Sequence, residues 1–168
     1  MCWIRVAVIC VLISLVKAQK ECFKRVVWSD LLHSLNILCK DISYECEHHH
    51  DKASLCDPQL MLGQMEHKEV VLADIMKKAV TMYEKSPQFD NFREQLAMSQ
   101  HRLTSCVMAQ LHSNADHEPV TTCFNKLENF LHHKKAHIQC AWKIIHITVR
   151  EILQRLEKRT VRGLRRRR

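Results

Sequence analysis

The segment QCAWKIIHITVREILQRLE, residues 139–157, decides the fold class of this chain. Its apolar residues recur at intervals of three and four, which places them on one face of an amphipathic α-helix. These residues are Ile145, Val149, Ile152 and Leu156. Ile144 and Ile147 add apolar surface outside this stripe, and a cysteine and a tryptophan open the segment. The pattern predicts a final helix that is anchored at its start and is apolar on more than one side.

Four further segments with helical periodicity precede it, at about 23–39, 64–84, 89–111 and 120–134. The residues expected to face the core are Val27, Leu31, Leu35 and Leu38, then Val71, Ile75, Ala79 and Met82, then Phe92, Leu96, Leu103 and Val107, and last Val120, Phe124, Leu127 and Leu131. The chain has only two glycines. Hairpin turns and phosphate-binding loops both need more glycine than this, so the composition argues against strand-rich folds and nucleotide-binding enzymes.

The connection between the first and second expected helices has more than twenty residues, with a polar stretch at 41–58, and is much longer than the other connections. A long first connection lets the first two helices lie parallel to each other. We therefore predict an all-α, five-helix up-up-down-down bundle with a long first crossover loop, stabilised by disulfides.

The two ends of the chain differ in composition from the middle. Residues 1–18 combine one arginine, an apolar run at 6–16 and a small residue at the end, as a secretory signal peptide does. That run is shorter than the roughly 20 residues that cross a bilayer. We expect a secreted, monomeric protein with no membrane span, a helical domain at 19–158 and a basic disordered tail at 159–168. The tail ends in Arg165, Arg166, Arg167 and Arg168.

Seven cysteines follow the expected signal peptide, and a secreted protein would use them in disulfides. They are Cys22, Cys39, Cys46, Cys56, Cys106, Cys123 and Cys140. Pairing Cys22 with Cys106 and Cys39 with Cys140 would join the ends of different helices, and each bond would be worth on the order of 4 to 5 kcal/mol in the chain-entropy model. Cys46 and Cys56 could then close a small loop. Sequence spacing alone leaves the connectivity open, and the odd count leaves at least one cysteine outside any internal pair.

Several motifs occur in an order that resembles the type I interferons, a family of class II helical cytokines. They are an N-terminal cysteine, ILCKD at 37–41, LTSCV at 103–107, CFNKLENFLHHKK at 123–135 and the CAW triplet at 140–142. The resemblance covers nearly the whole chain after the signal peptide. It implies a five-helix cytokine that binds two receptor chains and starts antiviral JAK-STAT signalling, and it implies the bonds Cys22–Cys106 and Cys39–Cys140.

The resemblance also implies a receptor-binding face on the last helix and on the end of the first. Alignment from the CAW triplet places His146, Ile147 and Arg150 on this face, together with Lys40 and Asp41. Arginine suits such a surface because it combines a fork of donors with a long apolar stem. The chain departs from mammalian members after Asp41, where Ile42 stands in place of an arginine, and His146 also replaces a common arginine. These departures indicate a non-mammalian member.

Other classes of function are less well supported by the residues. The segment EHHHD at 47–51 suggests a zinc site, but adjacent histidines point in different directions, and we expect neither a metal nor another cofactor. No nucleophile elbow, HExxH pair or phosphate loop is present, so we expect no enzyme. We also expect no nucleic-acid partner, because the basic tail is typical of a solvated charge run. The alternative to a cytokine is a cationic host-defence protein that acts on microbes or binds heparan sulfate through its arginine-rich tail.

Overall fold

The computed structural model is all-α, and it describes residues 26, 28–40, 46, 56–57, 61, 68–107, 117–134 and 137–165. Within this part of the chain there are five α-helices, one short 3-10 helix and no strand. The elements are α2 (Trp28–Cys39), α4 (Lys68–Tyr83), η3 (Pro87–Phe89), α5 (Asp90–Val107), α6 (Glu118–His133) and α7 (Ile138–Arg165). The predicted fold class is confirmed at this level, and each of the five expected helices has a counterpart.

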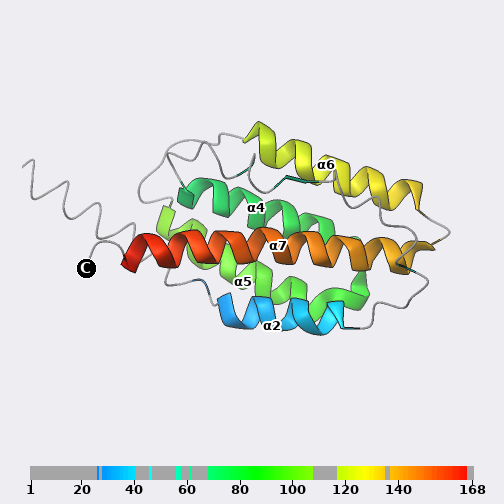
Figure 1. Ribbon diagram of the computed structural model, residues 1–168, viewed down its shortest axis with the longest axis horizontal. Coiled ribbons are helices and arrows are strands. Elements are labelled where there is room, and N and C mark those ends of the chain that lie inside the picture. Colours follow the sequence, from blue (N-terminus) through cyan, green and yellow to red (C-terminus); the bar gives the residue numbers. More distant parts are fainter. Residues whose placement is uncertain are drawn as a thin grey trace, which may run out of the picture.

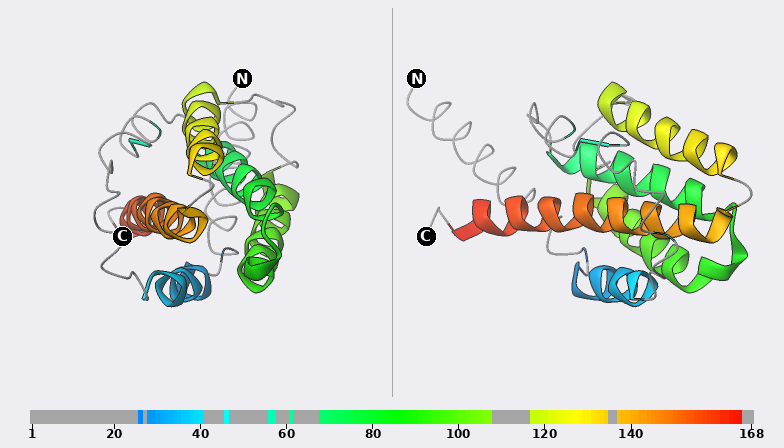
Figure 2. Two further views of the ribbon diagram at one scale, coloured as in Figure 1. Left: turned by 90° about the vertical axis from the view of Figure 1, so that its right-hand side faces the viewer. Right: turned by 45° about the vertical axis from the view of Figure 1, so that its right-hand side comes forward.

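The five α-helices pack side by side around one core. α4 lies against α5 and α6, α2 lies against α5 and α7, and α6 lies against α7. These contacts close a ring in the order α2, α5, α4, α6, α7, which Figure 2 shows in its left view, along the helices. By the colours in Figure 1, α2, α4 and α6 run in one direction, and α5 and α7 run in the other.

The apolar stripes identified in the sequence face this core. Every predicted core residue of α4, α6 and α7 is buried, and so are Leu31 and Leu35 of α2 and Phe92, Leu96 and Leu103 of α5. Leu38 is half-buried, while Val27 and the side chain of Val107 lie outside the described part. Burial of a full leucine or isoleucine side chain contributes about 1.5 to 3 kcal/mol, so these stripes hold the bundle together.

The last helix is longer than expected. α7 continues through Arg165, so the backbone of residues 159–165 is helical, where we expected the start of a disordered tail. Arginine, lysine and leucine are good helix formers, and up to Arg165 the basic residues of this stretch are interrupted by other residues. The expected signal peptide, residues 1–18, and Arg166, Arg167 and Arg168 lie outside the described residues. No helix in the described ranges has a stretch long and apolar enough to span a bilayer.

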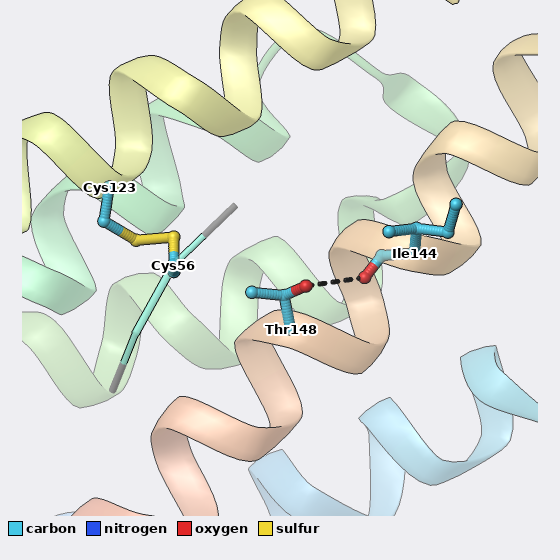
Figure 3. Close-up of a disulfide and its surroundings, with 4 residues drawn as sticks. All are labelled: Cys56, Cys123, Ile144 and Thr148. Atoms are coloured by element: carbon cyan, nitrogen blue, oxygen red, sulfur yellow. Dashed lines mark hydrogen bonds between the residues drawn. A yellow bond between two sulfur atoms is a disulfide. The ribbon is translucent and has the colours of Figure 1, made fainter. Parts of the chain in front are cut away.

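Two disulfides tie the connection between α2 and α4 to the last two helices. Cys46 bonds with Cys140, with 5.3 Å between their Cα atoms, and Cys56 bonds with Cys123, with 5.0 Å between theirs. The close-up in Figure 3 shows the second bond, which attaches the connection to α6. The predicted bonds Cys39–Cys140 and Cys46–Cys56 are therefore wrong. The remaining predicted bond, Cys22–Cys106, involves residues whose side chains are not described.

Cys39, the predicted partner of Cys140, has no disulfide partner among the described residues. Cys39 ends α2 and is a free thiol, 7% exposed. The entropic cost of closing a loop from Cys39 to Cys140 differs from that of a loop from Cys46 to Cys140 by under about 0.1 kcal/mol. The difference is small because the cost grows only with the logarithm of loop length. Spacing therefore cannot choose between the two partners. The choice falls to Cys46, whose place in the connection brings its Cα atom within disulfide range of Cys140.

The disulfides also explain why α7 has more than one apolar side. Cys140 and Ile144 are four residues apart and share one side of α7. Cys46 is buried and bonded on that side, and Ile144 is buried there too, away from the main core. Figure 3 shows Ile144 and Thr148 on α7, where the Thr148 hydroxyl donates to the Ile144 carbonyl over 2.9 Å. Ile144 therefore belongs to a second buried side, whereas Ile147 is only half-buried.

Candidate functional site

The outer surface where α2 and α7 meet carries an exposed row of side chains from α2. Arg150 of α7 donates a long hydrogen bond from Nη1 to Oδ1 of Asn36, over 3.5 Å. This contact places the row beside α7. We call this surface the α2–α7 face and define it by His33, Asn36, Ile37 and Lys40 of α2 with Ile147 and Arg150 of α7.

The row on α2 follows from helical spacing. Positions 33, 36, 37 and 40 are three, four and seven residues apart, so they share one side of the helix. The opposite side carries the buried residues Leu31, Leu35 and Cys39. Ile37 is 52% exposed, although a large apolar side chain is usually more stable inside. An apolar side chain flanked by cationic and amide groups is the kind of surface at which protein partners bind.

Arg150 is the most constrained member of the α2–α7 face. Its side chain is half-buried, and its Nε atom is shielded from solvent with no hydrogen-bond partner in the described part of the chain. A buried donor without a partner costs about 1 to 3 kcal/mol or more when charged. Arg150 also lies close enough to Cys39 to lower the pKa of that thiol, although burial raises it by more. The guanidinium of Arg150 is thus held beside Asn36, and its Nε–H group has no acceptor among the described residues.

The structure places the predicted receptor-facing residues in different environments. Ile147 and Arg150 are half-buried members of the α2–α7 face, and Lys40 is exposed at the end of α2. Asp41 lies outside the described residues. His146 is only 2% exposed, so its assignment to an exposed binding face is wrong. Alignment by motif could not detect the burial of His146, because that burial depends on the packing of Tyr83 from α4 against α7.

His146 instead belongs to a buried aromatic cluster formed by Tyr83, Phe89, Phe92, Trp142 and His146. The Tyr83 hydroxyl and His146 Nδ1 lie 2.8 Å apart and share a hydrogen bond. The Tyr83 ring stacks on the His146 ring, with 5.5 Å between centroids, and meets Phe92 edge-on at 4.9 Å. Phe89 lies between the cluster's rings, 5.0 Å from Trp142 and 4.5 Å from His146. Such aromatic pairs each add about 0.5 to 1.5 kcal/mol beyond area burial.

Burial sets the charge state of this cluster. It lowers the pKa of His146 to about 4, because a buried imidazolium loses its hydration. It also raises the pKa of Tyr83 well above its ordinary value, and the nearby Cys39 thiol raises it further. Both residues are neutral at physiological pH. The cluster therefore serves as a structural anchor for the start of α7 and provides no charged binding group.

One sequence signal for this cluster stands next to a predicted core residue and was not recognised as part of the core. Tyr83 follows the stripe residue Met82, and both are fully buried. α4 is therefore buried over a wider arc than one stripe, because α5, α6 and the start of α7 all pack near its end. Two aromatic residues close together, Phe89 and Phe92, follow on the next segment. The contact of Phe89 with Trp142 of the CAW triplet could be recognised only in three dimensions.

A cavity of about 460 Å³ opens beside this cluster, between the segment that follows α4, the C-terminal half of α6 and the start of α7. Trp142, Leu131 and Ile138 supply apolar walls. Lys85 and Glu128 also line it and form an ion pair of 2.9 Å. This pair joins the turn after α4 to α6. Exposed ion pairs contribute only about 0 to 1 kcal/mol, so this pair adds little to the stability of the bundle.

The described residues contain no group of three His, Cys, Asp or Glu side chains arranged to hold a metal ion. The EHHHD segment at 47–51 lies outside these residues.

No protein-family model, curated protein or solved structure matches this chain. A function is therefore inferred from its motifs, its helical bundle and the α2–α7 face.

Proposed function

We propose that this chain is a secreted type I interferon-like cytokine, which binds a two-chain cell-surface receptor and triggers antiviral JAK-STAT signalling. The observation that carries the proposal is the position of the CAW triplet. Ala141 and Trp142 are buried at the start of α7, and Cys140 is covalently tied to the connection after α2. The triplet thereby anchors a helix whose other side borders the exposed α2–α7 face.

The up-up-down-down topology with a long first crossover is part of this proposal. In a bundle of that kind the first two helices are parallel to each other and antiparallel to the other two. The directions of α2, α4, α5 and α7 in Figure 1 support it, with α6 as the additional helix. The disulfide pattern differs from the one that the resemblance implies. Cys46, seven residues after Cys39, bonds with Cys140, so the end of the first helix and the start of the last are still joined.

Secretion is also part of the proposal. Structural disulfides form and persist in oxidising compartments, and two disulfides within the described residues join distant segments of the chain. The apolar leader at 1–18 supplies the route to that compartment.

The α2–α7 face is the proposed contact with one receptor chain. Ile37 and Ile147 offer apolar surface, and Arg150 and Lys40 offer positive charge. The complementary receptor surface has an apolar hollow bordered by carboxylates, because interfaces match apolar cores with charges of opposite sign around them. His146 contributes indirectly, by fixing the start of α7.

A reporter-cell assay tests this function. Protein purified from the secretion medium is added to cells that carry an interferon-responsive promoter, and the same cells without either receptor chain serve as controls. We expect induction in the first cells and none in the second. Induction that persists without the receptor chains, or no induction in cells of the source species, contradicts the proposal.

The cationic host-defence alternative makes a different prediction for the tail. Removal of residues 163–168 takes away four arginines and leaves the α2–α7 face intact. A receptor ligand keeps its signalling activity after this deletion. A protein that acts directly on microbes through its tail loses its killing activity instead.

A further inference from the structure

The final turns of α7 form a basic helix that extends from the bundle. α7 is helical through Arg165, and its end reaches beyond the ends of the other four α-helices in Figure 1 and in the right view of Figure 2. The sequence of these turns, RLEKRTVRGLR at 155–165, contains five basic residues, which are Arg155, Lys158, Arg159, Arg162 and Arg165.

The spacing of these five residues places them on one side of the helix. At about 100° per residue, positions 155, 158, 159, 162 and 165 fall within an arc of about 120°. Glu157, the single acidic residue of the stretch, falls outside this arc. Arg155 and Lys158 are exposed. We call these five positions the basic stripe.

We propose that the basic stripe binds sulfated glycosaminoglycans of the heparan sulfate type and so retains the protein at cell surfaces. This inference goes beyond receptor binding and assigns the tail a defined geometry in place of a disordered charge run. A helix with cations three and four residues apart presents a row of positive charge about 15 Å long, at 1.5 Å per residue. A linear polyanion can neutralise such a row along its length, with release of its counterions.

The sequence around the stripe favours a polysaccharide over other polyanions. Single-stranded nucleic acids are bound with aromatic residues that stack on the bases, and no Phe, Trp or Tyr occurs after Trp142. A helix that lies in a membrane surface needs a broad apolar side, and after Lys158 the apolar residues are only Val161 and Leu164. The two disulfides fit an oxidising compartment, which is where sulfated glycosaminoglycans are met.

Thr160→Pro tests the helical arrangement without a change in charge. Proline in a helix interior removes a hydrogen bond and kinks or breaks the helix, which moves Arg162 and Arg165 out of line with Arg155. Thr160→Ala is the matched control, because it keeps the helix. On a heparin column we expect the proline variant to elute at lower salt and to bind about three- to tenfold more weakly at 0.15 M salt. Equal elution of the two variants would overturn the proposal, since charge alone would then suffice.

A second pair of variants tests the location. Arg155→Gln with Lys158→Gln removes two exposed charges from the stripe, and Arg102→Gln with Lys126→Gln removes two exposed charges from α5 and α6. The measured quantity is the slope of the logarithm of the heparin affinity against the logarithm of the salt concentration. We expect the first pair of substitutions to reduce this slope by about two, and the second pair to change it little. Equal effects of both pairs, or tighter binding to anionic phospholipid vesicles or single-stranded DNA than to heparin, would refute the assignment.

Discussion

The Tyr83 hydroxyl on α4 and the His146 imidazole on α7 form a hydrogen bond of 2.8 Å inside the bundle. Both residues are almost fully buried, at 0% and 2% exposure. With the proton of the neutral imidazole on Nε2, the Tyr83 hydroxyl donates to Nδ1. This bond joins the end of the second long helix to the start of the last, next to Trp142 of the CAW triplet. The stability of the bundle therefore depends on His146 remaining neutral.

Acidification should destabilise the protein through His146. An unfolded histidine binds its proton near pH 6.5, whereas folded His146 binds one only near pH 4. Between these values the unfolded state binds more protons, so the free energy of unfolding falls as the pH drops from about 6.5 to about 4. The loss from this group is on the order of 3 kcal/mol. Urea unfolding at pH 7.5 and pH 4 measures it, and in His146→Gln the difference should shrink by about that amount. An unchanged pH dependence in this variant would contradict the prediction.

Tyr83→Phe should destabilise the bundle although it keeps the ring. The change leaves Nδ1 of His146 buried without its partner, which costs about 1 to 3 kcal/mol. Thermal or urea unfolding at pH 7.5 measures the loss. In a His146→Phe background the same substitution should cost less, because no imidazole is left unpaired. Equal costs in both backgrounds would show that the hydrogen bond contributes nothing.

The disulfide Cys46–Cys140 should contribute substantially to stability. Its loop spans 94 residues, for which the chain-entropy model predicts about 4 to 5 kcal/mol, and strain can reduce this. We expect the double variant Cys46→Ser with Cys140→Ser to lose about 3 to 5 kcal/mol of unfolding free energy. Peptide mapping of the unreduced protein provides the direct check. Recovery of a Cys39–Cys140 peptide in place of Cys46–Cys140 would overturn the pairing.

Cys39 should be unreactive in the folded protein. Burial both covers the thiol and raises its pKa, so little thiolate is present at pH 7.5. Iodoacetamide should label the peptide that contains Cys39 only after the protein is unfolded in denaturant. Mass spectrometry of that peptide distinguishes the two states. Rapid labelling of Cys39 under native conditions would show that the end of α2 opens.

The α2–α7 face should carry the receptor affinity. We expect Arg150→Ala and Ile37→Ala each to weaken binding to the purified receptor ectodomain by about 1 to 2 kcal/mol, or roughly 5- to 30-fold. Ile147→Ala should weaken it in the same direction. Met98→Ala is the control, because Met98 is an exposed apolar residue on α5, at 47% exposure. Surface plasmon resonance measures the affinities, and a greater loss in the control than in Arg150→Ala would move the site elsewhere.

The helices and their buried stripes were predictable because helix periodicity is a local property. Ile145, Val149, Ile152 and Leu156 are all buried on α7, as their spacing indicated. The role of His146 was not predictable in this way. It lies one residue after a stripe position, and it is buried only because Tyr83 and Phe89 pack over it. The width of a buried face depends on which neighbours cover it.

The amino-acid sequence by itself determined the helical class, the core stripes and the positions of the cysteines. Tertiary structure alone decided which cysteines bond, because the entropy of closing loops of about 100 residues is nearly the same for Cys39 and Cys46. It also decided that Arg150 lies beside Asn36 at the surface while His146 is inside. Local periodicity is set by the geometry of one helix, whereas these choices require the relative positions of several helices.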